Sequence, residues 1–290
     1  MAEISAAAVK DLRDRTGAGM MDCKKALTDA GGDLDKATTL LRERGLAKAA
    51  KREGRATAEG TVALALAGSA GALVELGCET DFVARTDEFQ RIARAVAEVA
   101  ARDASAGDVE GLGKAAMEGE TVAARIVAAA GKLGENVVLK RVARLEVPDG
   151  LVGGYVHAGG KLGVLVGLRT SARGEGADAL AKDVAMHVAA ADPSPVSVDR
   201  SGVPADLVER ERELFAKQAA QSGKPEKVIE KIVEGRLQKF YSEVTLLEQP
   251  FVKDPDRTIQ ELLARTGKEL GAEVAVTGFV RFRLGADGHS

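Results

Sequence analysis

The chain has 290 residues, of which 45% are hydrophobic and 29% charged, and its formal net charge is −3. This length allows two domains of ordinary size, and the composition is that of a globular protein. The slightly acidic balance argues against a general nucleic-acid binder, which usually carries a basic surface. Aromatic residues make up only 3% and tryptophan is absent, so we expect a core of Ala, Val, Leu and Ile.

The cysteine content and the start of the chain bear on its compartment. Only Cys23 and Cys78 occur, which is no disulfide framework, and a reducing compartment is therefore expected. Residues 1–4 lack the basic and apolar regions of a secretory signal. No apolar run reaches the roughly 18–20 residues of a membrane span. We expect a cytoplasmic protein without a membrane-bound part.

Residues 1–54 predict a bundle of three short helices. Ser5 and Asp33 are of the residue types that cap helix N-termini, and each precedes apolar residues at helical spacing. Gly17, Gly19, Gly31 and Gly32 fall between the helical segments, where glycine favours turns. The first unit of the chain is therefore expected to be a small helical domain.

Residues 55–145 predict a domain in which strands and helices alternate. The expected strands are 61–67, 72–78 and 137–145, and the expected helices are 88–101 and 122–130. A glycine-containing turn at 68–71 separates the first two strands, which predicts a hairpin. This pattern is typical of an α+β domain.

A similar pattern returns in residues 146–200 and 242–290, which are predicted to form a second α+β domain. Strands are expected at 151–156, 162–168 and 273–284, with helices at 177–191 and 259–264. Residues 71–76 and 163–168 are alike, and each precedes a helix that ends in a Val-Ala-Ala string. We interpret this as a duplicated hairpin-plus-helix unit.

Residues 201–241 predict an inserted hairpin of two charged helices. The helices are expected at 204–221 and 226–241, and the Ser-Gly-Lys-Pro string at 222–225 breaks them. Each carries a narrow apolar stripe, as in a coiled coil. The sequence leaves three roles open for this hairpin, namely self-association, contact with a partner, or neither.

Phe82 is the most unusual single residue of the sequence. It follows the buried strand expected at 72–78 and precedes Thr86, which with the two acids after it is typical of a helix start. Phe82 is therefore expected in a strand-to-helix connection. In a chain with so few aromatic residues, it either folds back into the core or inserts into a binding partner. The sequence leaves both alternatives open.

No catalytic or cofactor-binding pattern is present in the sequence. There is no His/Cys cluster with metal-ligand spacing, no phosphate-binding glycine loop and no nucleophile elbow. His187 is isolated, and such a histidine is more often a packing residue than a ligand or base. We predict a protein with no catalytic residue, metal or cofactor, which acts by binding.

Several segments, taken together and in order, resemble the elongation factor Ts family, the guanine-nucleotide exchange factors of elongation factor Tu. The segments are 9–27, 79–84, 186–190, 223–225 and 249–252. Each string alone is modestly specific, but five in the right order run through nearly the whole chain.

The resemblance implies a fold and a partner. It implies an N-terminal bundle similar to a ubiquitin-associated (UBA) domain, a core of two related α+β subdomains with antiparallel sheets, and an inserted antiparallel coiled coil. The implied partner is the GTPase elongation factor Tu, with no direct contact to nucleic acid. Family members often carry further helical residues after the last strand, whereas this chain stops soon after Arg283. A contact made by such a helix is therefore not expected.

The resemblance also implies roles for particular residues. The segment that would enter the partner's GTPase domain and disturb its magnesium site is Thr80, Asp81, Phe82 and Val83. Residues of the bundle that would touch the same domain are Leu12, Met20, Met21 and Lys24. Met186 and His187 would lie at the surface facing the partner's C-terminal barrel. The alternative function is a non-catalytic scaffold or chaperone-like binding module.

Overall fold

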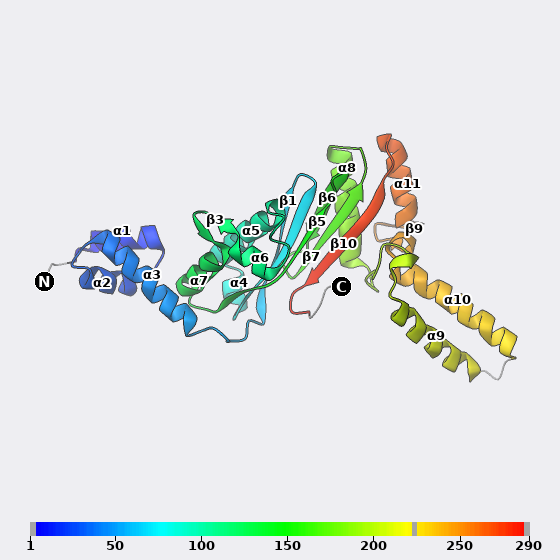
Figure 1. The fold of residues 1–290 in the computed structure, drawn as a ribbon, viewed down its shortest axis with the longest axis horizontal. Helices are drawn as coiled ribbons and strands as arrows, with labels where there is room; N and C mark the ends of the chain where they lie inside the picture. The colour runs from blue at the N-terminus through cyan, green and yellow to red at the C-terminus, as the bar shows by residue number, and fades with distance from the viewer. Residues whose placement is uncertain (1–3, 222–224, 287–290) are drawn as a thin grey trace. The chain divides into compact units, whose positions relative to one another are not determined.

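The computed structural model describes residues 4–221 and 225–286, and it combines helices with small sheets (Figure 1). This confirms the predicted α+β class. The chain forms two compact units, the first made of Met1–Ala63 and Val74–Val142 and the second of Leu64–Leu73 and Ala143–Ser290. The finer division into 1–54, 55–145, 146–200 with 242–290, and 201–241 stays a prediction.

The first unit begins with the three expected helices, α1 (Ala6–Thr16), α2 (Met20–Asp29) and α3 (Leu34–Ala50). Both predicted caps are present. Ser5 accepts a hydrogen bond from the Ala8 N–H, and Asp33 accepts two from the first turn of α3. The side chains that fill the centre of the bundle are Val9, Leu12, Cys23, Ala26, Leu27 and Ala37. The likeness to a ubiquitin-associated domain stays a prediction.

A three-stranded sheet follows, with the strand order β1-β2-β5. Its strands are β1 (Glu59–Ala67), β2 (Ala70–Cys78) and β5 (Val137–Glu146). The helices between β2 and β5 are α4 (Asp81–Ala84), α5 (Asp87–Arg102), α6 (Val109–Lys114) and α7 (Val122–Leu133). A pair of two-residue strands, β3 (Ala116–Met117) and β4 (Glu120–Thr121), precedes α7.

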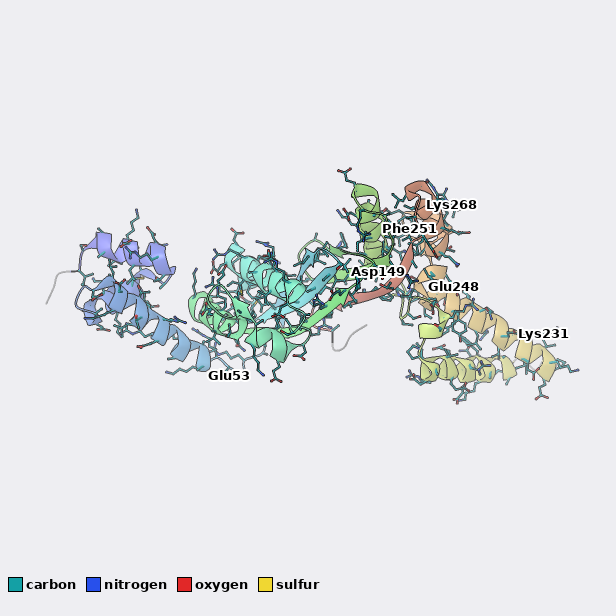
Figure 2. All side chains as sticks on the ribbon, turned by 45° about the horizontal axis from the view of Figure 1, so that its top comes forward. Glu53, Asp149, Lys231, Glu248, Phe251 and Lys268 are labelled. Atoms are coloured by element: carbon teal, nitrogen blue, oxygen red, sulfur yellow. The ribbon has the colours of Figure 1, made fainter. Side chains whose placement is uncertain are left out.

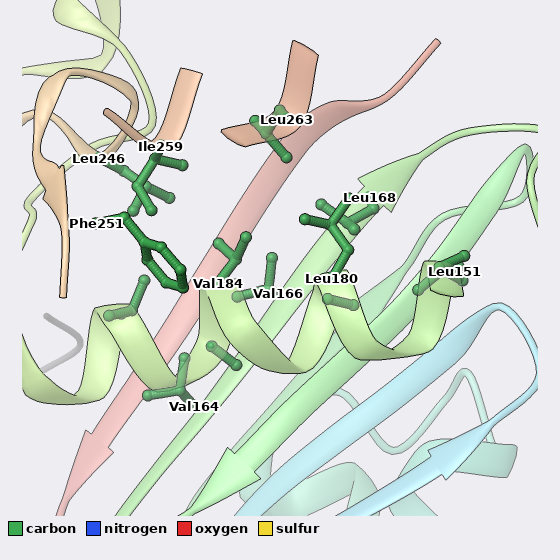
Figure 3. Close-up of a cluster of buried hydrophobic side chains, with 14 residues drawn as sticks. Leu151, Val164, Val166, Leu168, Leu180, Val184, Leu246, Phe251, Ile259 and Leu263 are labelled. Carbon is green, nitrogen blue, oxygen red and sulfur yellow. The ribbon is translucent and has the colours of Figure 1, made fainter. Parts of the chain in front are cut away.

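The second unit contains an antiparallel sheet with the order β10-β7-β6. Its strands are β6 (Gly150–Val156), β7 (Leu162–Arg169) and β10 (Ala275–Arg283). Helix α8 (Glu175–Ala190) lies across one face, and Figure 3 shows Leu180 and Val184 of this helix over Val164 and Val166 of β7. A side chain at Gly153 would come within 2.4 Å of the Ala181 side chain. The glycine therefore lets α8 lie close to β6.

The two sheets share one connection scheme, which supports the predicted duplication. In each case a hairpin leads into a long helix, and a later strand then pairs with the second strand of the hairpin. The first set of elements is β1, β2, α5 and β5, and the matching set is β6, β7, α8 and β10. The equivalent connection adds to the sequence likeness between 71–76 and 163–168.

The predicted helical hairpin is present as α9 (Ala205–Ala220) and α10 (Glu226–Val244), while residues 222–224 of its expected turn lie outside the described residues. Ala219, Val233 and Leu237 are buried between the two helices. Arg200 fixes the base of the hairpin through Glu248, with Nε 2.5 Å from Oε1. In Figure 2, Glu248 lies beside the C-terminal end of α10, and Lys231 lies further out along the helix.

Part of the segment 249–252, for which the sequence pattern gives no strand, pairs as a strand. Strand β8 (Pro250–Phe251) forms an antiparallel pair with β9 (Asp254–Thr258), which leads into α11 (Ile259–Leu270). Phe251 is buried, and its ring points to α8 in Figure 3. A strand of two residues has no periodicity, so the sequence pattern could not show it.

Within the first unit, the bundle packs on α7 through two glycines. A side chain at Gly131 of α7 would come within 2.8 Å of the carbonyl oxygen of Gly45 on α3. A side chain at Gly45 would meet only the Gly131 Cα, at 3.9 Å. The backbones of the two helices are thus in direct contact, and only Gly131 is required by the packing.

We expect Gly131→Ala and Gly45→Ala to act in opposite directions. The added methyl of Gly131→Ala meets backbone and must push α3 away from α7, so the segment at 51–58 should be cut faster in limited proteolysis. Gly45→Ala fits in the structure and gains up to about 1 kcal/mol in helix propensity. Its cleavage rate should match or fall below that of the wild type. Equal cleavage rates for the two variants would contradict this packing.

Candidate functional site

The candidate site is built where β2 ends and the chain enters α4. Thr80 caps α4 by accepting a hydrogen bond from the Val83 N–H at 3.3 Å, and Thr86 caps α5 in the same way. The predicted connection is therefore one helical turn. Phe82 lies on this turn with 81% of its surface exposed. The alternative in which Phe82 folds back into the core is thus wrong.

The C-terminal end of α4 is held by side chains of the next segment. The Thr86 hydroxyl donates to the Val83 carbonyl at 2.8 Å, and the Gln90 amide donates to the Ala84 carbonyl at 2.8 Å. Asp81 makes an ion pair with Arg85 at 3.0 Å on the outer surface. An exposed pair of this kind adds little stability, so the two hydrogen bonds define this end.

The N-terminal end of α4 is held by buried and partly buried polar groups. Glu135 accepts hydrogen bonds from the backbone of Glu79 and from both the backbone and the hydroxyl of Thr80. The Cys78 thiol donates to the Thr80 carbonyl at 3.2 Å. Burial raises the pKa of this thiol to about 12, so it stays protonated at neutral pH. The Asn136 N–H lowers the pKa of the Glu79 carboxyl.

Three of the four predicted contact residues of the bundle are exposed to solvent, and the fourth is buried. Met20 and Met21 begin α2 and are 57% and 75% exposed, and Lys24 is exposed one turn later. Methionine is flexible and polarisable and suits an adaptable contact surface. Leu12 is 0% exposed in the centre of the bundle. The expectation that Leu12 itself touches a partner is therefore wrong, and its contribution is to the packing behind that surface.

The structure also corrects the expected surface position of His187. Met186 is half-buried near the end of α8, but His187 is only 1% exposed. Its Nδ1 accepts a hydrogen bond from the Val252 N–H at 3.3 Å, so its Nε2 carries the proton and donates to the Gln249 side-chain oxygen at 2.9 Å. Burial lowers the pKa of His187, and the neutral ring is the stable form.

Gln249 extends this network beyond His187. Its side-chain nitrogen donates to the carbonyl of Pro193 at 2.9 Å and to the carbonyl of Glu243 at 2.6 Å. One amide thus joins the end of α8, the loop after it and the base of the helical hairpin. His187 is therefore an internal anchor rather than an exposed binding group.

The candidate residues lie on several separate elements. Two cavities, of about 400 Å³ and about 770 Å³, are lined by other residues. Within 4–221 and 225–286, no group of three or more His, Cys, Asp or Glu side chains is arranged to hold a metal ion. None of the helices in these described ranges has both the length and the apolar character needed to cross a bilayer.

An aromatic side chain is exposed on a fixed helical turn, and two exposed methionines begin another helix in the same unit of the chain. These are features of proteins that act by binding another protein. The arrangement gives large apolar groups a fixed place outside the core, whereas ordinary packing would bury them.

Comparisons with known proteins identify the family. A model of the elongation factor Ts family matches residues 79–286. Elongation factor Ts of Rhodospirillum rubrum is 50% identical over 98% of this chain and 94% of its own length. That of Prosthecochloris aestuarii is 49% identical over 99% of this chain and 100% of its own length. The chain belongs to the elongation factor Ts family, whose members are factors of protein biosynthesis.

Sequence reasoning missed two residues that organise these regions. Glu135 lies more than fifty positions after Thr80 in the chain, and no local pattern connects them. Gln249 belongs to one of the segments that carry the family resemblance, but its bonds to Pro193 and Glu243 follow only from the fold. A sequence motif can identify an important residue, but only the tertiary structure shows which groups that residue contacts.

We expect His187 to make the stability of the chain depend on pH. Because its folded pKa lies below the usual 6.5, its contribution is complete above pH 6.5 and is lost as the pH falls toward the folded value. Between pH 7.5 and 5.5, urea denaturation should show a larger loss of unfolding free energy for the wild type than for His187→Gln, by at most about 1.4 kcal/mol per pH unit. Parallel curves for the two proteins would contradict the buried neutral ring.

Proposed function

We propose that this chain is a guanine-nucleotide exchange factor for the GTPase elongation factor Tu. In this proposal it binds the GDP-bound partner, promotes GDP release by disturbing the magnesium and phosphate site, and so allows GTP to load. Membership of the elongation factor Ts family supports the partner. The observation that carries the mechanism is Phe82, which is 81% exposed on a turn that is hydrogen-bonded at both ends.

The chemistry of the partner's site explains how binding alone can release a nucleotide. GTPases of this type hold the phosphates with a loop, a lysine and a magnesium ion that offsets the phosphate charge. Displacing the magnesium weakens GDP binding, and no proton transfer or covalent step is needed. The protein acts by differential affinity, since it binds the nucleotide-free partner more tightly than the GDP-bound one. By linkage, GDP weakens the grip of the factor by the same ratio.

The energy available from Phe82 is of the right size for this task. Burying a phenylalanine side chain contributes roughly 1.5–3 kcal/mol. Each ~1.4 kcal/mol changes an equilibrium tenfold, so one buried ring weakens GDP binding by about 10- to 100-fold when it is buried only in the nucleotide-free complex. Because the existing hydrogen bonds already fix α4, little ordering is left to occur on binding. Thr80, Asp81 and Val83 complete the inserted segment in this proposal.

Other surfaces supply the remaining affinity in this proposal. Met20, Met21 and Lys24 dock the bundle on the GTPase domain, and the half-buried Met186 faces the partner's C-terminal barrel. Leu12 and His187 are buried and act through the elements that they hold. The helical hairpin keeps the three roles that the sequence leaves open, self-association among them.

A scaffold or chaperone-like binding module is the competing function. It would use the same exposed residues and would leave the partner's nucleotide in place. The rate of GDP release from elongation factor Tu separates the two functions, because only the exchange factor changes it. Phe82 favours exchange, because an exposed aromatic side chain on a turn whose backbone is fixed at both ends suits insertion into one specific site.

We expect Phe82→Ala to lose exchange while it keeps its stability. The side chain is exposed, so its removal should change the unfolding free energy by less than about 0.5 kcal/mol. In stopped-flow release of labelled GDP from elongation factor Tu, the saturating rate should fall by about tenfold or more, as expected for a lost buried ring. A folded variant that stimulates release like the wild type would remove Phe82 from the mechanism.

We expect the two exposed methionines to affect affinity rather than the saturating rate. Met20→Ala and Met21→Ala should each weaken binding to nucleotide-free elongation factor Tu by about threefold to tenfold, because interface side chains of this size contribute about 1 kcal/mol. Isothermal titration gives the dissociation constants. Unchanged constants for both variants would show that this end of α2 is not a contact surface. Thr28→Ala, on the last turn of the same helix, is the matched control.

A further inference from the structure

One carboxylate outside the predicted site residues holds the start of α4. Glu135 follows Gly134, whose left-handed φ of 81° ends α7 and turns the chain. The Glu135 Oε2 accepts the backbone N–H groups of Glu79 and Thr80, both at 3.0 Å, and its Oε1 accepts the Thr80 hydroxyl at 2.6 Å. A charged acceptor with three such bonds fixes both the place and the orientation of the two residues.

The same two segments are also joined in the opposite direction. The Glu79 Oε1 accepts the Asn136 N–H at 2.7 Å, and the Asn136 side chain donates to the Arg55 carbonyl at 2.9 Å. Arg55 in turn lies 3.4 Å from the other Glu79 oxygen. The end of β2 and the turn after α7 are thus joined reciprocally. The carboxylate of each segment accepts hydrogen bonds from the backbone N–H groups of the other. We call this arrangement the reciprocal carboxylate contact of Glu79 and Glu135.

The Thr80 hydroxyl passes this constraint on to α4. A hydroxyl has one proton and two lone pairs. The proton is used for Glu135, and a lone pair accepts the Val83 N–H at 3.3 Å, which caps the helix. The Thr80 carbonyl accepts the Ala84 N–H at 3.1 Å and closes the turn. The rotamer of Thr80 that caps α4 is therefore the one that Glu135 selects.

Helix α4 depends on such anchors because it has only four residues. A single helical turn is not stable alone, since nucleation costs more than one hydrogen bond returns. Thr86 and Gln90 hold its C-terminal end, and Glu135 holds its N-terminal end. Phe82 lies two residues after Thr80 and is almost free of internal packing, so the backbone of α4 sets its direction.

We propose that Glu135 is a positioning residue, which orients Phe82 for insertion into the partner through the Thr80 hydroxyl. This inference rests on the proposed exchange function. Glu135 acts before binding, because its bonds lie within the free chain. Without it, α4 samples other orientations, and the fraction of molecules ready to insert falls. The loss then appears as a slower release of GDP.

The experiment measures labelled GDP release from elongation factor Tu with the full chain, titrated to saturation. Glu135→Ala removes all three acceptors, and we expect the saturating rate to fall about tenfold, as for misplacement of a reacting group. Glu135→Gln keeps one oxygen for the backbone N–H groups but places an amide donor against the Thr80 hydroxyl. Its rate should lie between those of the wild type and Glu135→Ala. Glu98→Gln, in an exposed pair with Arg102, is the matched control and should match the wild type.

Two further readouts separate positioning from a general structural effect. In the Phe82→Ala background, Glu135→Ala should lower the rate by less than about twofold, because the group that it positions is already absent. In the free chain, hydrogen exchange of residues 79–85 should become about tenfold faster in Glu135→Ala, while exchange in α5 and α7 stays unchanged. Glu135→Gln provides the same tests if Glu135→Ala does not fold.

The outcomes distinguish this inference from the proposed function. If the wild type fails to accelerate GDP release, the proposed function is wrong. If the wild type accelerates release and both Glu135 variants match it, the exchange function stands and the positioning role is overturned. Equal losses in the wild-type and Phe82→Ala backgrounds would also overturn it, because they would show an effect that does not pass through Phe82.

Discussion

The reciprocal carboxylate contact of Glu79 and Glu135 determines the geometry of α4, the exposed turn that carries Phe82. It joins the end of β2 to the turn after α7, and through Thr80 it caps the single turn that carries Phe82. Glu79, Thr80 and Glu135 are only partly buried, but the two carboxylates satisfy backbone N–H groups beyond the end of a strand. At this place directional hydrogen bonds fix the position of the backbone, whereas side-chain packing fixes it elsewhere in the fold.

Elsewhere the fold depends on close approach between small residues. Gly153 lets α8 lie on its sheet, and Gly131 lets α3 touch α7. A chain with 3% aromatic residues cannot fill wide gaps between its elements, so narrow gaps closed by Gly and Ala are the consistent solution. Phe251 is one of the aromatic residues used inside, where it packs against α8. This leaves Phe82 as the exposed exception, and the proposed insertion into a partner accounts for it.

Local patterns predicted most of the fold, whereas contacts between distant segments were beyond them. The helix caps at Ser5 and Asp33, the two hairpins with their helices and the coiled coil follow from residue type and periodicity. The pair of β8 and β9 and the turn of α4 are too short for a period. The sequence left Phe82 with two alternatives, and the resemblance placed Leu12 and His187 at a surface. Burial of both side chains corrects this, because a family motif identifies a residue and not the direction in which its side chain points.

The way in which α4 is held has a consequence for optical studies of this protein. Main-chain bonds and the neighbouring Thr, Glu and Gln side chains fix the turn, so the ring at position 82 is not part of what keeps it folded. Since the sequence contains no tryptophan, an indole introduced at this position would be the sole emitter of its kind. Its fluorescence would then report the moment at which water leaves that ring, with no other indole emission from the chain.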